Sequence, residues 1–141
     1  MRHRRSRIGI PGKPDRARMM ARNLVTSILL YESIRTTRKR AKAVQPMVDR
    51  LIALAKRSSK REAIRSLMQV VTDDNACRKT LEVFVPRYAH RPSGFTRIVP
   101  VGLRKGDGAQ LVDLVMMDQV SGQQAASSGK RAKKVSTPAS T

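Results

Sequence analysis

The chain has 141 residues, of which 30 are Lys or Arg and 10 are Asp or Glu, so its formal charge at pH 7 is +20. This charge exceeds what solubility requires and argues for a polyanionic partner. No apolar run approaches the roughly 20 residues of a membrane span, and a single cysteine, Cys77, excludes an internal disulfide.

The positive charge is concentrated toward the N-terminus. Residues 1–65 hold 19 basic and 4 acidic residues, whereas residues 66–141 hold 11 and 6. Aromatic residues are few, namely Tyr31, Phe84, Tyr88 and Phe95. Because proteins that read unpaired bases stack them on aromatic side chains, this composition favours recognition of phosphates and of nucleic-acid shape.

Residues 1–14 predict an extended basic arm. Two glycines and two prolines between residues 9 and 14 oppose regular structure, and the arm has little apolar surface to bury. Its candidate nucleic-acid contacts are Arg2, His3, Arg4, Arg5 and Arg7. The alternative is a loose solubilising tail.

A first helix is expected from Asp15, as its N-cap, to about Tyr31. Its predicted inward stripe, with Val25 beside it, is Ala17, Met20, Ala21, Leu24, Ile28 and Tyr31. Arg16, Arg18 and Arg22 fall mostly outside this stripe, so we expect them to reach a partner without disturbing the core.

Residues 33–36 alternate as a short strand does, and residues 37–57 then predict a second helix. Its apolar face consists of Ala41, Val44, Val48, Leu51, Ile52 and Ala55. We expect the hydroxyl of Thr36 or Thr37 to cap the helix. Pro46 predicts a kink within one bent helix. The side chains projected opposite the apolar face are Lys39, Lys42, Arg50 and Arg57.

The start of this second helix has an unfavourable charge pattern. Cations crowd the positive end of the helix dipole, where each costs about 0.3–1 kcal/mol. Amides at a helix N-terminus beside such cations form a phosphate site. The predicted central phosphate clamp is Arg35, Arg38, Lys39, Arg40 and Lys42, with Thr36 and Thr37 beside it. A solvated basic helix end is the alternative interpretation.

Ser59 and Glu62 form the pattern of a capping box, which opens a third helix with Ile64, Leu67, Met68 and Val71 inward. A fourth helix is expected from residues 72–75 to about Val85. Asp73 and Asp74 could suggest a metal or acid–base site, but a capping aspartate explains them without one.

The C-terminal third predicts a basic loop at 86–94 and a hairpin of strands 96–104 and 111–118, joined by the turn residues 105–108. Pro100 indicates that its strand lies at an edge of the sheet or contains a bulge. The second strand is nearly all apolar and is expected to be central. Further candidate contacts are Arg87, Arg91, Arg97, Arg104 and Lys105. Residues 121–141 are of low complexity and are expected to be unfolded, which leaves a domain at 15–120.

No motif supports catalysis. Zinc needs about four ligands at recognisable spacing, and His3, His90 and Cys77 do not supply them. No nucleophile motif or phosphate-cradling loop is present. We therefore predict no catalytic residues, no metal, no cofactor and no small-molecule substrate.

Five segments in order carry a family resemblance: MRHR (1–4), YESIRTT (31–37), PRY (86–88), GFTRI (94–98) and RKGDGA (104–109). Over about residues 1–118 they resemble the L-seventeen family of bacterial large-ribosomal-subunit proteins. The resemblance implies an α+β fold, a two-layer domain of about four helices against a small three-stranded sheet.

The resemblance also implies a function: a structural constituent of the large ribosomal subunit that binds and stabilises folded ribosomal RNA in translation. It implies neighbouring ribosomal proteins and a place on the solvent side near the peptide exit. We expect a cytoplasmic bacterial ribosome rather than an organellar one, no membrane contact and no homo-oligomer. The alternatives are a helical DNA-binding or architectural protein, and a basic nuclease that depends on Asp73 and Asp74.

Overall fold

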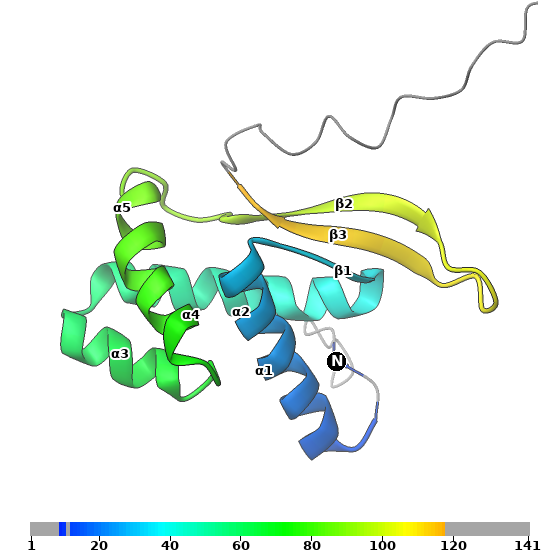
Figure 1. Ribbon diagram of the computed structural model, residues 1–141, viewed down its shortest axis with the longest axis horizontal. Helices are drawn as coiled ribbons and strands as arrows, with labels where there is room; N and C mark the ends of the chain where they lie inside the picture. The colour runs from blue at the N-terminus through cyan, green and yellow to red at the C-terminus, as the bar shows by residue number, and fades with distance from the viewer. Residues whose placement is uncertain (1–8, 11, 118–141) are drawn as a thin grey trace, which may run out of the picture.

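The structure, a computed structural model, describes residues 9–10 and 12–117. Within these residues, helices lie on one side of a three-stranded antiparallel sheet and form a two-layer α+β fold (Figure 1). This arrangement confirms the predicted fold class. The predicted arm, residues 1–14, falls largely outside the described residues, and the predicted tail, residues 121–141, falls entirely outside them.

The helical layer contains three separate helices and one longer run. The helices are α1 (Pro14–Tyr31), α2 (Arg38–Arg57) and α3 (Lys60–Met68). The run consists of α4 (Asp74–Lys79), the π-helical segment η1 (Thr80–Phe84) and α5 (Val85–Arg87), which follow one another directly. The fourth helix therefore continues to Arg87, two residues beyond its predicted end.

The sheet has the order β1–β3–β2, with strands β1 (Ser33–Thr37), β2 (Thr96–Leu103) and β3 (Gln110–Met116). Strand β3 is central, as its apolar sequence predicts, and it buries Val112, Leu114 and Met116 against the helices. Strand β2 lies at an edge, and its register shifts between Pro100 and Gly102. Both parts of the interpretation of Pro100 are therefore confirmed.

Helix α2 is the centre of the core. All six residues of its predicted apolar face are buried. Asp49 fixes the helix to the start of β2, because its Oδ1 accepts hydrogen bonds from the Phe95 backbone N–H and from the Thr96 hydroxyl, both at 3.2 Å. The opposite, cation-bearing side of α2 is thereby held outward.

Two expectations for α1 are wrong. The helix begins at Pro14 with Lys13 in the N-cap position, and Asp15 lies in its first turn. Proline suits this place because the first helical N–H has no partner to lose. Tyr31 is 72% exposed rather than inward. The buried side of α1 includes Val25, Thr26 and Leu29, which shifts the stripe away from Tyr31.

Other helix ends also differ from expectation. Thr37 occupies the N-cap position of α2 and also pairs with Leu111 in the sheet, but its side chain forms no capping hydrogen bond. Met68, expected inward, is 50% exposed. The Ser59 backbone N–H donates to Glu62 as the capping box predicts, and Asp73 accepts the Asn75 backbone N–H at 2.7 Å.

The aromatic side chains are mostly core residues. Phe84, Tyr88 and Phe95 are buried. The Tyr88 ring packs against both of the others, and its centroid lies 6.1 Å from that of Phe84 and 5.1 Å from that of Phe95. The Tyr88 hydroxyl donates to the Met117 carbonyl. Of the four aromatic residues only Tyr31 remains exposed, so the domain offers no aromatic platform for stacking a series of bases.

Candidate nucleic-acid interface

The Lys and Arg side chains of the described residues fall into two groups, those with a partner in the chain and those without. The distinction matters because a cation that already holds two elements together has fewer N–H groups to offer a phosphate. The sequence does not separate the two groups, since both occur in the same basic clusters.

Arg22 belongs to the first group. Its Nε donates to the Val70 carbonyl at 3.0 Å and its Nη2 donates to the Gln69 carbonyl at 2.9 Å. These carbonyls lie just past the C-terminal end of α3, where a cation is favourable. Arg22 therefore joins α1 to the end of α3.

Arg87 is part of a cluster around Glu32. The Glu32 carboxylate accepts from Lys79 and Arg87, each at 2.8 Å, and both cations lie over the Phe84 ring. Partial burial would raise the pKa of Glu32, but hydrogen bonds and charge from Arg87 and Lys79 outweigh it and hold the pKa below its usual value of 4.5. The cluster joins the end of α1 to the helical run formed by α4, η1 and α5.

Arg91 orders the loop between α5 and β2. Its guanidinium donates to the Gly94 carbonyl at 3.1 Å, and its own carbonyl accepts from Lys56 of α2 at 2.6 Å. The first of these bonds orders the predicted basic loop internally, and the second ties the loop to α2.

Four further candidates have partners at the surface. Arg35 forms a two-bond pair with Asp113, its partner across the strands, at 2.8 and 3.1 Å. Arg104 forms a similar pair with Asp107 in the hairpin turn. Arg18 lies 3.7 Å from Asp15, and Arg38 donates to Gln110 at 3.1 Å. Exposed pairs contribute only about 0–1 kcal/mol, so a phosphate can compete for these cations.

The remaining described candidates have no hydrogen-bond or ion-pair partner among residues 9–10 and 12–117, and all are exposed: Arg16, Lys39, Arg40, Lys42, Arg97 and Lys105. Three of them, Lys39, Arg40 and Lys42, lie in the first turns of α2. Thr36, in contrast, is buried in β1.

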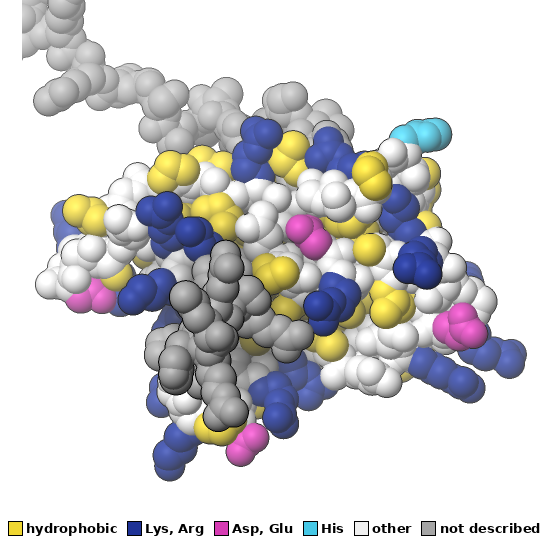
Figure 2. Space-filling model, turned by 180° about the vertical axis from the view of Figure 1, so that it is seen from behind, with side chains coloured by type: hydrophobic (Ala, Val, Ile, Leu, Met, Phe, Trp, Pro, Cys, Tyr) yellow, Lys and Arg dark blue, Asp and Glu magenta, His cyan; other side chains and the backbone are white. Residues whose placement is uncertain are grey.

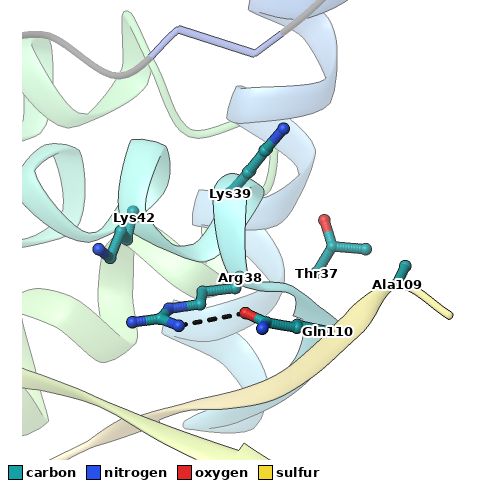
Figure 3. A pocket seen from close by; sticks show the side chains of 6 residues that line it. All are labelled: Thr37, Arg38, Lys39, Lys42, Ala109 and Gln110. Atoms are coloured by element: carbon teal, nitrogen blue, oxygen red, sulfur yellow. Dashed lines mark hydrogen bonds between the residues drawn. The ribbon is translucent and has the colours of Figure 1, made fainter. Parts of the chain in front are cut away.

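A hollow of about 640 Å³ lies beside these first turns. We call it the N-terminal hollow, and it is lined by Thr37, Arg38, Lys39, Lys42, Ala109 and Gln110. Figure 3 shows Arg38 turned toward Gln110, while Lys39 and Lys42 point away from that pair and in different directions. Among the described residues, the lining contains three cations and no carboxylate, so the hollow suits an anion.

Several exposed cations are not among the predicted contacts. Arg50, Arg57, Lys60, Arg61, Arg65 and Arg78 are exposed and have no ion-pair partner within the described part of the chain. Arg50 and Arg57 were identifiable, because their spacing places them on the same outer side of α2 as Lys39. Figure 2 shows Lys and Arg side chains spread over the rear face, with isolated acidic side chains among them.

The five arm candidates, Arg2, His3, Arg4, Arg5 and Arg7, lie outside the described residues. Asp73 and Asp74 stand at the start of α4, and the part of the chain that is described contains no group of three His, Cys, Asp or Glu residues able to hold a metal ion. Burial, aided by the charges of Asp74 and Asp73, raises the pKa of the nearby Cys77 thiol. None of the described helices is long and apolar enough to cross a bilayer.

Comparison with known proteins relates the chain to one family. Residues 20–116 match the profile of the family described as ribosomal protein L17. The chain is 41% identical over 107 residues to the large ribosomal subunit protein bL17 of Clostridium botulinum strain Hall, which covers 75% of this chain and 94% of that protein. It is 40% identical over 111 residues to bL17 of Desulforudis audaxviator, covering 79% of this chain and 96% of that one. With bL17 of Syntrophotalea carbinolica the identity is 39% over 119 residues, covering 84% and 76%. The chain therefore belongs to the ribosomal protein L17 family.

Proposed function

We propose that the chain binds folded large-subunit ribosomal RNA through phosphate and ribose groups and holds that RNA in its folded form. Family membership makes the chain a structural constituent of the large ribosomal subunit and not an enzyme. We place it in the cytoplasmic ribosome of a bacterium, among neighbouring large-subunit proteins. The relatives named bL17 that are described above come from bacteria.

The observation that carries the proposal is the N-terminal hollow. Three cations line it, and no carboxylate from the described part of the chain does. Lys39 and Lys42 have no partner among the described residues, although together with Arg38 and Arg40 they repel one another and the helix dipole. A bound phosphodiester would relieve this repulsion, and it would also meet the backbone N–H groups at the start of α2.

The predicted contacts take different parts in this proposal. Lys39, Arg40 and Lys42 contact phosphates directly, while Arg35 and Arg38 exchange an exposed partner for RNA. Arg22, Arg87 and Arg91 hold elements together and use only their remaining N–H groups. The other proposed contacts are Arg2, His3, Arg4, Arg5, Arg7, Arg16, Arg18, Thr37, Arg97, Arg104 and Lys105. Thr36 is not proposed as a contact, because its side chain is buried in β1.

The test is the salt dependence of binding of the full chain to protein-free large-subunit ribosomal RNA. Each phosphate contact contributes about 0.7–0.9 to the slope of log K against log salt concentration. Lys39→Gln/Lys42→Gln should lower the slope by about 1.6 relative to the unmodified chain. A slope that is nearly flat for the unmodified chain would contradict binding through phosphates.

A competition experiment separates this function from general binding of nucleic acids. Duplex DNA of matched length should displace the chain from ribosomal RNA only at a large excess, because the RNA supplies shape and 2′-hydroxyl groups that DNA lacks. Equal competition by DNA would favour an architectural DNA-binding protein instead.

A further inference from the structure

A second hollow lies at the other end of α2. This α2–α3 hollow has a volume of about 430 Å³ and is lined by Arg50, Ala53, Leu54, Arg57, Ser58 and Glu62. Arg50 and Arg57 are exposed and have no partner within the described residues. Glu62 accepts a hydrogen bond from the Ser59 backbone N–H, so its carboxylate is directed to the start of α3.

The two hollows lie along one exposed stripe of α2. Lys39 and Arg57 are eighteen residues apart, which is five full turns, so their side chains leave the helix in the same direction about 27 Å apart. Arg50 lies close to the same line. Between the cations the stripe carries the small or compact residues Ala43, Pro46 and Ala53, which allow close approach of a backbone.

A third hollow shows that cations alone do not define such a surface. The α3–α4 hollow has nearly the same volume, about 420 Å³, and includes Lys60 and Arg78. It also includes Asp74 and Glu82, so its lining charges cancel. Counted over the residues that the structure describes, the lining charge is thus +3 in the N-terminal hollow, +1 in the α2–α3 hollow and zero in the α3–α4 hollow.

We propose that the outer stripe of α2 is a continuous RNA-binding surface, in which Arg50 and Arg57 at the α2–α3 hollow contact phosphates of a second stretch of RNA backbone. This inference rests on the proposed function and extends it to a site whose far cation, Arg57, lies about five helical turns from Lys39 at the N-terminal hollow. An RNA that contacts both ends of α2 is held in position along the whole helix. The helix itself is rigid because its opposite face is buried in the core.

The experiment compares three double variants of the full chain on protein-free large-subunit ribosomal RNA. Arg50→Gln/Arg57→Gln tests the second site, Lys39→Gln/Lys42→Gln tests the N-terminal hollow, and Lys60→Gln/Arg78→Gln is the control. Each removes two exposed positive charges, so a general loss of charge affects all three alike. Thermal unfolding monitored by circular dichroism verifies that each variant is folded.

If the second site binds phosphates, Arg50→Gln/Arg57→Gln should lower the slope of log K against log salt by about 1.6 relative to the unmodified chain. The control should change the slope by well under half of that amount. If Arg50→Gln/Arg57→Gln behaves like the control while Lys39→Gln/Lys42→Gln lowers the slope, the inference is overturned and the proposed function stands. If neither variant differs from the control, both are overturned.

One further outcome would identify another kind of partner. If Arg50→Gln/Arg57→Gln binds protein-free RNA as the unmodified chain does, but fails to enter reconstituted large subunits, the α2–α3 hollow contacts an acidic protein surface. That result would also overturn the inference.

Discussion

This protein has few carboxylates, and several of them hold two elements of the fold together. Glu32 joins Lys79 and Arg87, Asp49 receives two hydrogen bonds from the start of β2, and Asp113 pairs with Arg35 across the sheet. Glu32 also has a φ of 61°, a left-handed conformation in which glycine is usual at a helix end. Its carboxylate explains why glutamate stands there, since glycine would supply the turn but not the two ion pairs.

Glu32→Gln should lower the free energy of unfolding by about 2 kcal/mol, because two partly buried cations lose their counter-charge. Only 17% of the Glu32 side chain is exposed. Urea denaturation provides the measurement. Glu82→Gln, which removes the same charge from an exposed side chain, is the control and should change stability little. Equal losses in both variants would show that the effect is one of net charge.

The same residue predicts a dependence on pH. The pKa of Glu32 in the folded protein lies below 4.5. Its stabilising contribution is therefore complete above that ordinary value and is lost as the pH falls through the lowered folded pKa. The stability difference between the unmodified chain and Glu32→Gln should narrow below about pH 4.5, which urea denaturation at several pH values measures. A constant difference down to pH 3 would refute this assignment.

The ionisation of Asp49 should make stability depend on pH in the opposite direction to that of Glu32. Its burial raises the pKa above 3.8, even though hydrogen bonds from Thr96 and Phe95 lower it. Folding therefore disfavours the charged form, and this cost appears as the pH rises through the folded pKa.

Asp49→Asn keeps one acceptor oxygen and should cost less than about 1 kcal/mol, whereas Asp49→Ala leaves the Phe95 N–H without a partner and should cost about 1–3 kcal/mol. Denaturation curves of both variants at neutral pH test the difference.

At the scale of elements, α2 explains how one helix serves both the core and the proposed interface. One face carries six buried apolar residues that pack against the sheet and the other helices. The opposite face carries Lys39, Lys42, Arg50 and Arg57, which the core leaves in solvent. Helical periodicity alone separates these faces, so stability and binding can be altered independently.

This separation can be tested with Ile52→Ala. Ile52 is fully buried, and its truncation should cost about 2–5 kcal/mol through lost burial and the cavity left behind. Leu103→Ala is the control, since Leu103 is 69% exposed and should change stability by less than about 0.5 kcal/mol. Thermal unfolding measures both. Below its melting temperature, Ile52→Ala should still bind ribosomal RNA with the unmodified salt slope, and a lowered slope would contradict independent faces.

At the scale of the whole molecule, most of the charge is uncompensated. The formal charge is +20, and many exposed Lys and Arg side chains have no partner within residues 9–10 and 12–117. Mutual repulsion of this kind destabilises the compact state of a protein free in solution. Binding to a polyanion would remove that cost, so we expect the free chain to be less stable than the bound one.

Salt should therefore stabilise the free protein. Raising KCl from about 0.05 M to about 0.5 M shortens the Debye length severalfold and screens the repulsion more than it weakens the few exposed ion pairs. The melting temperature of the unmodified chain should rise, and that of Lys39→Gln/Lys42→Gln should rise less. Circular dichroism at each salt concentration gives the comparison. A fall in melting temperature with salt would show that the ion pairs dominate.

Local patterns in the sequence were sufficient to predict the helices, the strands and the buried face of α2, because side-chain spacings of 3.6 and 2 residues can be read directly from the chain. It also identified the central strand, the edge strand with its bulge, and the family. Its errors at Tyr31, Met68 and Asp15 concern which neighbours cover a side chain or where a helix begins, and those depend on how elements pack.

Which cations have partners, in contrast, follows from the fold and not from local sequence. Arg22 and Lys39 are indistinguishable in a basic sequence, but the carbonyls of Gln69 and Val70 meet Arg22 from 47 and 48 residues away, and nothing described meets Lys39. The α2–α3 hollow likewise exists only because the end of α2 and the start of α3 lie beside each other. Contacts between distant parts of the chain depend on the packing of whole elements, and local periodicity carries no information about them.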